Sequence, residues 1–321
     1  MKFTKKLFAS VIFAISNLIP TVYADSQSQF EQAYQAYQKG DFKTAFNLFK
    51  PLAEQGDAKG QYNLGIMYRD GEGVEDDYQQ AVKWFIKSAE QENAEAQNNL
   101  GLMYLDGYGV KEDYQQAIKW FIKSAEQGNA EAQYNLGIMY SGGYGVKWDY
   151  QQAIEWFIKS AEQGYAEAQF ALGLRYGKEY AVETDYHQVE KWYTKAAVQG
   201  HAEAQYNLGM LYYEGKEIKQ NYQQAVKGFT KAAEQGYAEA QYNLGVMYDR
   251  GQGVKQDYQQ ATKWFKKATT QKTIEEQYEV AEIYYYEKQD KKEAKTWAGK
   301  ACENGYKKGC EMYHKLNDRG Y

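Results

Sequence analysis

Histidine and cysteine are scarce in this chain of 321 residues, which has three histidines and two cysteines. A metal site needs about four clustered ligands, and His187, His201 and His314 stand in no ligand-spaced motif. We therefore predict neither a metal nor a cofactor. Long apolar runs are also missing after residue 24. Because a spanning helix needs about 20 apolar residues, no later segment is predicted to cross a bilayer.

Motifs of several enzyme classes are missing as well. The Ser-x-x-Lys and Lys-Thr-Gly boxes, with which serine penicillin-recognising enzymes place nucleophile and base, do not occur. The recurrent Gly-x-Gly follows no predicted strand and precedes no P-loop lysine. A catalytic acid pair needs two different environments, whereas the repeated carboxylates occupy equivalent positions. These carboxylates are Glu95, Glu131, Glu167, Glu203 and Glu239. We predict no catalytic residues and no enzyme activity.

The first 24 residues differ in kind from the rest. Lys2, Lys5 and Lys6 precede an apolar run from Leu7 to Ile19, and Ala24 follows shortly after. This layout predicts a secretory signal peptide over residues 1–24, and with it a protein exported to the periplasm or the medium. An uncleaved membrane anchor is the alternative, but the apolar run has about 13 residues where a spanning helix needs about 20.

The chain after residue 24 is acidic, with 35 basic and 43 acidic residues and a net charge of −8. A balance of this sign argues against a nucleic acid or an anionic membrane as partner.

A 36-residue period organises the remaining sequence. The pair Leu-Gly recurs at this spacing six times, at Leu64, Leu100, Leu136, Leu172, Leu208 and Leu244 with the glycine that follows each. The flanking apolar residues have helical spacing, which predicts one helix, helix A. A loop such as Gly71-Glu72-Gly73-Val74 ends it, because glycine supplies the left-handed backbone that a helix C-terminus commonly needs.

A second helix, helix B, is predicted to follow each loop. Asp77 with Gln80, and equivalent pairs onward, have the spacing of a capping box. Helix B then buries Ala81, Trp84, Phe85 and Ala89 or their equivalents. The glycine of each Leu-Gly pair costs about 1 kcal/mol inside helix A, so we expect helix B to approach closely there.

The period defines both the fold and its divisions. We predict an all-α, right-handed superhelical solenoid of stacked 36-residue helical hairpins, with about seven to eight repeats. Residues 25–56 form an N-terminal capping hairpin, in which Pro51 should bend or end the second helix. Residues 57–272 hold six full units. Residues 273–321 hold a divergent last repeat, with Val280-Ala281 in place of Leu-Gly, and a capping helix over about Tyr306 to Leu316.

These motifs resemble the Sel-one-like repeat family, relatives of the tetratricopeptide repeats. The matching residues of one unit are, in order, Ala94, Leu100, Gly101, Tyr104, Gly107, Gly109, Val110, Ala117, Trp120 and Ala125. The resemblance covers about Gln27 to Leu316. It implies a scaffold or adaptor without common enzyme activity. Some exported members are linked to penicillin binding, but the absent serine-lysine box disfavours a β-lactam-interacting enzyme here.

The resemblance also bears on the two cysteines. Cys302 and Cys310 match a disulfide spacing found in cysteine-rich members of the family. In an oxidising compartment we expect this pair to close and to join the capping helix to the stack. Free or redox-active thiols are the alternative.

The tetratricopeptide relatives bind ligands on a concave face lined by A helices. Alignment of the Leu-Gly pairs places the following candidates on that face: Tyr62, Asn63, Asn99, Tyr134, Asn135, Tyr206, Asn207, Tyr242 and Asn243. Asparagine can donate to and accept from an extended peptide, and tyrosine adds rigid contact area. Packing between hairpins is the alternative role. The fourth unit departs from the pattern at Ala171, Arg175 and Lys178 to Val182.

Taken together, the sequence predicts an interaction scaffold of the bacterial cell envelope that binds a protein or peptide on its concave face. The alternative is a protein that binds peptidoglycan or another cell-wall glycan, a reading that the 33 tyrosines favour.

Overall fold

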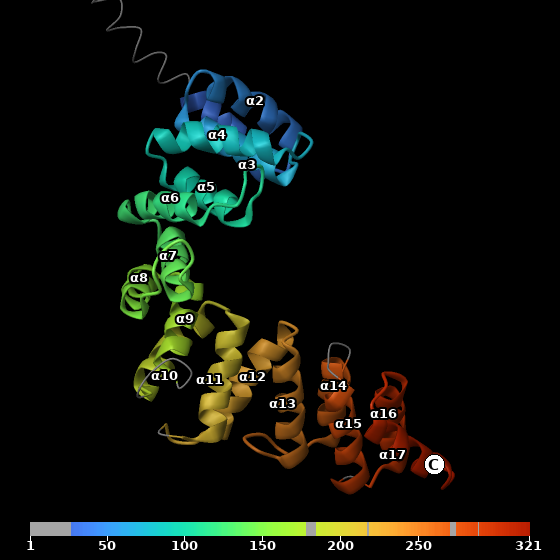
Figure 1. Ribbon diagram of the computed structural model, residues 1–321. Coiled ribbons are helices and arrows are strands. Elements are labelled where there is room, and N and C mark those ends of the chain that lie inside the picture. Colours follow the sequence, from blue (N-terminus) through green and yellow to red (C-terminus); the bar gives the residue numbers. More distant parts are fainter. Residues whose placement is uncertain (1–26, 178–183, 217, 270–273, 288) are drawn as a thin grey trace, which may run out of the picture. The chain divides into compact units, whose positions relative to one another are not determined.

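The computed structural model describes residues 27–177, 184–216, 218–269, 274–287 and 289–321. The predicted signal peptide and the departures at Lys178 to Val182 lie outside these residues. The chain divides into two units, Met1–Gln163 and Gly164–Tyr321. Within the described part of the chain every regular element is helical (Figure 1), and no helix there combines the length and apolarity that crossing a membrane requires.

Each unit is a series of antiparallel helix pairs, most of them 13-residue helices. The first unit contains a helix over residues 27–38, then α2 (Phe42–Glu54), α3 (Ala58–Asp70), α4 (Tyr78–Glu90), α5 (Ala94–Asp106), α6 (Tyr114–Glu126), α7 (Ala130–Gly142) and α8 (Tyr150–Glu162).

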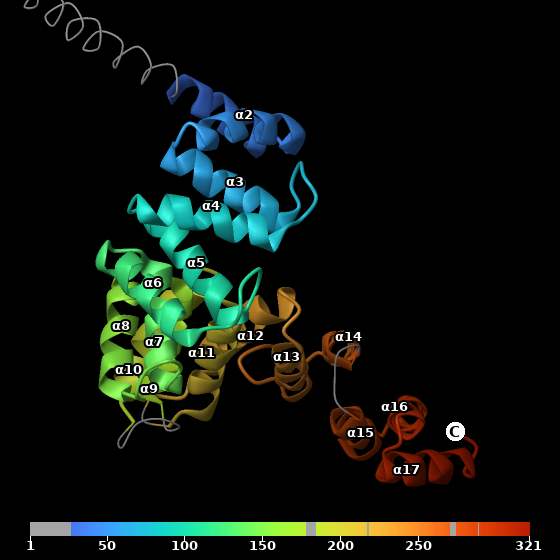
Figure 2. The same ribbon diagram turned by 45° about the horizontal axis from the view of Figure 1, so that its top comes forward.

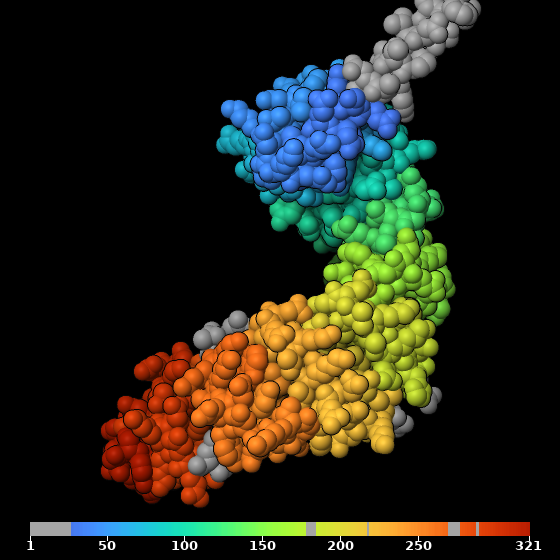
Figure 3. Space-filling model, turned by 180° about the vertical axis from the view of Figure 1, so that it is seen from behind, coloured from blue at the N-terminus to red at the C-terminus, as the bar shows by residue number. Residues whose placement is uncertain are grey.

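The second unit continues the same alternation of helices A and B. Its helices are α9 (Ala166–Tyr176), α10 (Tyr186–Val198), α11 (Ala202–Glu214), α12 (Tyr222–Glu234), α13 (Ala238–Arg250), α14 (Tyr258–Thr269), α15 (Ile274–Glu282), the π-helical η1 (Ile283–Glu287), α16 (Lys291–Glu303) and α17 (Lys307–Asn317). The turned view shows the helices in pairs (Figure 2), and within each unit the atoms of consecutive hairpins lie against one another (Figure 3).

The aspartate half of each predicted cap is confirmed, but the glutamine does not complete a capping box, because the backbone N–H of Asp77 donates to the carbonyl of Tyr68 at 2.8 Å. The Asp77 side chain accepts a hydrogen bond from the backbone N–H of Gln80 at 3.0 Å, and the equivalent caps follow at the same period. Gly71 ends α3 in the left-handed region at φ 70°. The second loop glycine, Gly73, is also left-handed and lies against the backbone carbonyl of Phe42 in the preceding helix B, where no side chain would fit.

Helix A and helix B meet at the Leu-Gly glycine. A Cβ atom at Gly137 would lie 2.5 Å from the ring of Phe157, a residue that is fully buried. The same holds at four other glycines, where a Cβ atom would lie 2.6–2.7 Å from the phenylalanine ring of helix B. These are Gly65, Gly101, Gly209 and Gly245. The expected close approach is therefore present, and it is made by an aromatic ring of helix B.

Hydrogen bonds that repeat with the period join helix B to helix A within a hairpin, and others join one hairpin to the next. Ser124 Oγ donates to the carbonyl of Ala94 in the preceding helix A at 2.6 Å, as do Ser88 and Ser160 at their positions. Buried Gln133 donates to the carbonyl of Ala125 in the preceding helix B at 3.1 Å. The amide of Gln163, just after α8, donates to Gln133 Oε1 at 2.8 Å. Each glutamine pair therefore links three consecutive helices.

The N-terminal hairpin corrects one expectation. Helix α2 continues through Pro51 to Glu54, the position at which the other B helices end. Proline removes one backbone donor there, but its φ is compatible with a helix. The turn at Gly56, with φ +98°, follows as it does in the later hairpins.

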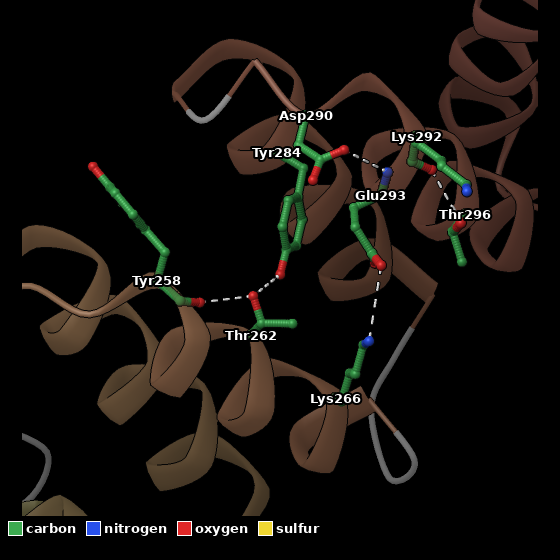
Figure 4. A network of polar contacts seen from close by, with 8 residues as sticks. All are labelled: Tyr258, Thr262, Lys266, Tyr284, Asp290, Lys292, Glu293 and Thr296. Carbon is green, nitrogen blue, oxygen red and sulfur yellow. Dashed lines mark hydrogen bonds and ion pairs between the residues drawn. The ribbon is translucent and has the colours of Figure 1, made fainter.

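The last repeat is held by a different set of contacts. Tyr284 in η1 donates its hydroxyl to Thr262 Oγ1 at 2.5 Å, and Thr262 Oγ1 in turn donates to the carbonyl of Tyr258 at 2.8 Å (Figure 4). Lys266 faces Glu293 at 3.8 Å. A disulfide between Cys302 and Cys310 joins α16 to α17, as expected. The capping helix begins at Lys307 and ends at Asn317.

The glycine contact yields a first prediction. Gly137→Ala should lower the free energy of unfolding by about 1–3 kcal/mol because the methyl group overlaps the Phe157 ring. In the double variant with Phe157→Leu the overlap is relieved, so thermal and chemical denaturation should show a loss smaller than the sum of the two single losses. Additive losses would contradict the proposed contact.

The disulfide yields a second prediction. The double variant Cys302→Ala and Cys310→Ala should lose about 2–3 kcal/mol of stability in the last hairpin, since the closed loop no longer restricts the unfolded chain. Proteolysis should then cut α17 faster than in the oxidised parent, while α4 keeps its protection as an internal control. Two alkylatable thiols in the unreduced protein isolated from its native cells would contradict the disulfide.

Candidate functional site

The candidate tyrosines and asparagines occupy two adjacent positions in the middle of successive A helices. The tyrosine rings are half-buried and pack against the phenylalanine of helix B in the same hairpin, with ring centroids 5.5–6.1 Å apart. The pairs are Tyr62 with Phe85, Tyr134 with Phe157, Tyr206 with Phe229 and Tyr242 with Phe265. Each of these tyrosines is therefore partly exposed to solvent.

The candidate asparagines are also half-buried, and their amides take two kinds of partner. Asn63 and Asn99 donate to backbone carbonyls within their own helices, at 2.8 and 2.9 Å. Asn135 donates across hairpins to Asn98 Oδ1 at 3.0 Å. Asn243 donates across hairpins to the Tyr206 hydroxyl at 3.3 Å.

Two neighbouring residues extend these contacts. Arg69 donates to Asn99 Oδ1 at 2.5 Å from the preceding hairpin. Asn98 stands where other A helices have the candidate tyrosine, and it is 1% exposed. The face therefore combines half-exposed polar groups with bonds between hairpins.

Exposed carboxylates accompany the tyrosines. Burial and, next, the carboxylate of Glu95 raise the pKa of Tyr62. In the second unit, burial followed by Glu239 and Glu203 raises the pKa of Tyr237 to about 12. Tyr237 lies 5.0 Å from Tyr206, ring centroid to ring centroid. These tyrosines stay neutral at physiological pH, while the glutamates beside them give the face a negative charge.

Asn207 differs from the other candidates because it lines a cavity of about 390 Å³. The other lining residues are Leu174, Gly177, Tyr193, Met210, Leu211 and Glu214. The cavity has apolar walls from α9, α10 and α11, with the Asn207 amide and the Glu214 carboxylate as polar groups. A small polar or cationic side chain could enter it.

The structure also shows residues that the sequence reasoning did not single out. The glutamine pairs, such as Gln133 with Gln163, recur every 36 residues, and this repetition is visible in the sequence. Helix B tryptophans carry a lysine over the ring, as Lys123 lies 4.3 Å from the centroid of Trp120. The sequence signal for this contact is the lysine that stands three residues after each helix B tryptophan.

The fold and these surfaces define a class of protein: stacked helical hairpins with a repeated polar face. The Sel1 repeat family model matches residues 28–57, 58–93, 94–129, 130–165, 166–201, 202–237, 238–272 and 277–306. The chain therefore belongs to the Sel1 repeat family, with eight repeats, and the predicted number of seven to eight is confirmed. Proteins of this family are generally protein-interaction scaffolds without enzyme activity.

Two solved structures place the chain among close structural relatives. One is a protective antigen present in uropathogenic Escherichia coli strains and displaying an SLR fold; it is 34% identical at a TM-score of 0.81, over 95% of this chain and 67% of that chain. The other is a Sel1 repeat protein from Oxalobacter formigenes, 29% identical at a TM-score of 0.65, over 75% of this chain and 96% of that chain. Comparison with curated proteins gives no match.

Proposed function

We propose that this protein is a non-enzymatic scaffold of the bacterial cell envelope that holds an extended segment of a protein partner along the A helices. The observation that carries the proposal is the repeated row of half-exposed asparagine and tyrosine side chains with exposed glutamates beside them. Asparagine amides suit the backbone of an extended peptide, and tyrosine edges provide contact area at low entropic cost. The glutamates favour a segment that carries lysine or arginine.

The envelope location rests on two independent features. Residues 1–24 have the layout of a signal peptide. The disulfide between Cys302 and Cys310 requires an oxidising compartment to persist.

A second candidate function, glycan binding, is favoured by exposed aromatic residues along the loops of the first unit. Tyr78 and Tyr108 stack with ring centroids 5.1 Å apart and are 39% and 50% exposed. Tyr114 and Tyr144 form the next pair at 5.7 Å, and Trp148 is 61% exposed. Exposed aromatic rings can stack on the apolar faces of sugars.

The third prediction tests peptide binding. In affinity capture from the native envelope with the chain from residue 25 onward, Glu203→Gln with Glu239→Gln should lower recovery of a basic partner several-fold at low salt. Exposed glutamates of helix B provide the matched control, so Glu162→Gln with Glu234→Gln should leave recovery unchanged. Equal recovery from both double variants would contradict the assigned face.

Asparagine variants separate binding from packing within the same experiment. Asn207→Ala should weaken capture with little change in thermal stability. Asn135→Ala should weaken capture and also cost about 1 kcal/mol, because Asn98 loses its donor. A stability loss without any loss of capture would assign both residues to packing.

The fourth prediction tests the glycan alternative. If the loop aromatics bind cell-wall glycan, the protein should pellet with purified peptidoglycan, and Tyr108→Ala with Tyr144→Ala should abolish pelleting. The variants Glu203→Gln and Glu239→Gln should pellet like the parent. Absence of pelleting by the parent protein would remove this candidate function.

A further inference from the structure

A tryptophan occupies one position of helix B in most hairpins, and a lysine covers its ring. The lysine Nζ lies 3.9–4.5 Å from the centroid of the tryptophan ring three residues earlier. The tryptophans are Trp84, Trp120, Trp156, Trp192, Trp264 and Trp297. At such distances the ammonium group and the face of the ring attract each other.

Trp84 and Trp264 show how this ring packs against neighbouring helices. Trp84 packs with Ala53 of α2 and with Leu64 of α3, beside Tyr68. Trp264 packs in the same way with Ala233 and Leu244 in the second unit. We call this position between one helix B, the next helix A and the next helix B the tryptophan seat.

Helix α12 lacks this tryptophan and leaves its seat open. Gly228 stands 144 residues after Trp84, four periods along the chain. Ala197, Leu208 and Tyr212 are the equivalents of the residues around Trp84, and all three line a cavity of about 240 Å³. The remaining lining residues are Thr194, Val198, Gln205, Gln224, Lys227, Gly228 and Lys231. An apolar cavity of about 150 Å³ can hold benzene, so this one has room for a larger aromatic ring.

The chain cannot refill the seat from Gly228 itself. A Cβ atom on Gly228 would lie 2.7 Å from the carbonyl oxygen of Gln205 and 3.0 Å from Gly209 Cα. Helix α12 therefore lies too close to α11 for a side chain at this position, and the open seat is a stable feature of the packing.

The rim of the cavity departs from the repeat in the preceding hairpin. Val198 is 77% exposed, although the equivalent residue is glutamate in other hairpins, at Glu54, Glu90, Glu126, Glu162 and Glu234. Lys227 and Lys231 remain on the opposite helix, where the tryptophan is missing. The carboxylate of Glu190 accepts a hydrogen bond from the Tyr212 hydroxyl at 2.5 Å. The lining thus has two lysines and, among the described residues, no carboxylate.

We propose that this cavity, the open tryptophan seat, binds a tryptophan side chain of a partner protein from a segment with neighbouring carboxylates. The ring would take the place that Trp84 and Trp264 fill in their own hairpins, under Lys231 as those rings lie under Lys87 and Lys267. The carboxylates would face Lys227 and Lys231. The site shares no residue with the asparagine and tyrosine candidates, so it goes beyond the proposed function.

Short peptides provide the test, titrated into the chain from residue 25 onward and followed by calorimetry and ligand-observed NMR. Acetyl-Asp-Trp-Asp-amide should bind saturably at one site with a Kd on the order of 1 mM, which corresponds to about −4 kcal/mol. Acetyl-Asn-Trp-Asn-amide should bind about two- to fivefold more weakly, since exposed ion pairs contribute little each. Acetyl-Asp-Ala-Asp-amide should not bind.

Variants assign the binding to this cavity. Thr194→Trp changes an exposed lining residue and should block the seat, while circular dichroism shows the fold intact. Lys227→Ala with Lys231→Ala should abolish the preference for the acidic peptide. The matched control is Lys83→Ala with Lys87→Ala, the same positions beside the filled seat of Trp84, and it should change nothing.

Several results would overturn the proposal. One is that the acidic tryptophan peptide shows no saturable binding, and another is that the Thr194→Trp variant binds it as well as the parent does. An equal effect of the two lysine double variants would also contradict the proposal. Tighter binding of free N-acetyltryptophan than of the acidic peptide would also overturn it, because the occupant would then be a small aromatic acid. The variants Glu203→Gln and Glu239→Gln test the proposed peptide face and do not touch the open tryptophan seat. The result for one proposal therefore does not decide the other.

Discussion

The contact between a glycine of helix A and an aromatic ring of helix B determines how each hairpin is built. Any side chain at Gly137 would overlap Phe157, so the two helices approach to a distance that only glycine permits. The same phenylalanine ring supports Tyr134, a candidate binding residue, at 5.7 Å between centroids. The candidate face is therefore positioned by the interaction that closes the hairpin, and a change at the glycine would displace both.

Polar contacts between helices are a separate layer of the structure. Serine hydroxyls bond to helix A carbonyls in the first unit, but Ala196 and Ala232 stand at those positions in the second. The glutamine pairs continue in both units, for example Gln127 with Gln97 and Gln235 with Gln205. A buried amide left without a partner costs about 1–3 kcal/mol, so these pairs favour one register of stacking over others.

The sequence predicted the features that depend on local residue chemistry. Leu-Gly spacing, the Asp77 cap and the left-handed Gly71 each follow from a preference of the residue itself. The hydrogen-bond partner of each asparagine amide does not follow from such a preference. Asn63 donates to its own helix, whereas Asn135 at the equivalent position donates to Asn98 in the preceding hairpin. Residue type alone does not decide this choice, since Asn243 donates to Tyr206 in the preceding hairpin while Asn99, which has Tyr62 at the same relative position, donates to its own helix. The choice depends on how the side chains are placed where two hairpins meet, which is visible only in the assembled structure.

Departures from the repeat have a particular meaning in such a structure. Because stability is roughly a sum over hairpins and their interfaces, a weaker interface in one place is tolerated when its neighbours are intact. Filling the seat beside Lys231 would require α12 to move away from Gly209, while Val198 exposes an apolar surface that a glutamate would have kept polar. The two departures belong to neighbouring hairpins and give up a packing contact or a polar side chain at the same cavity. Neutral drift would distribute such losses among hairpins, whereas selection for a ligand would concentrate them where that ligand restores the missing contacts.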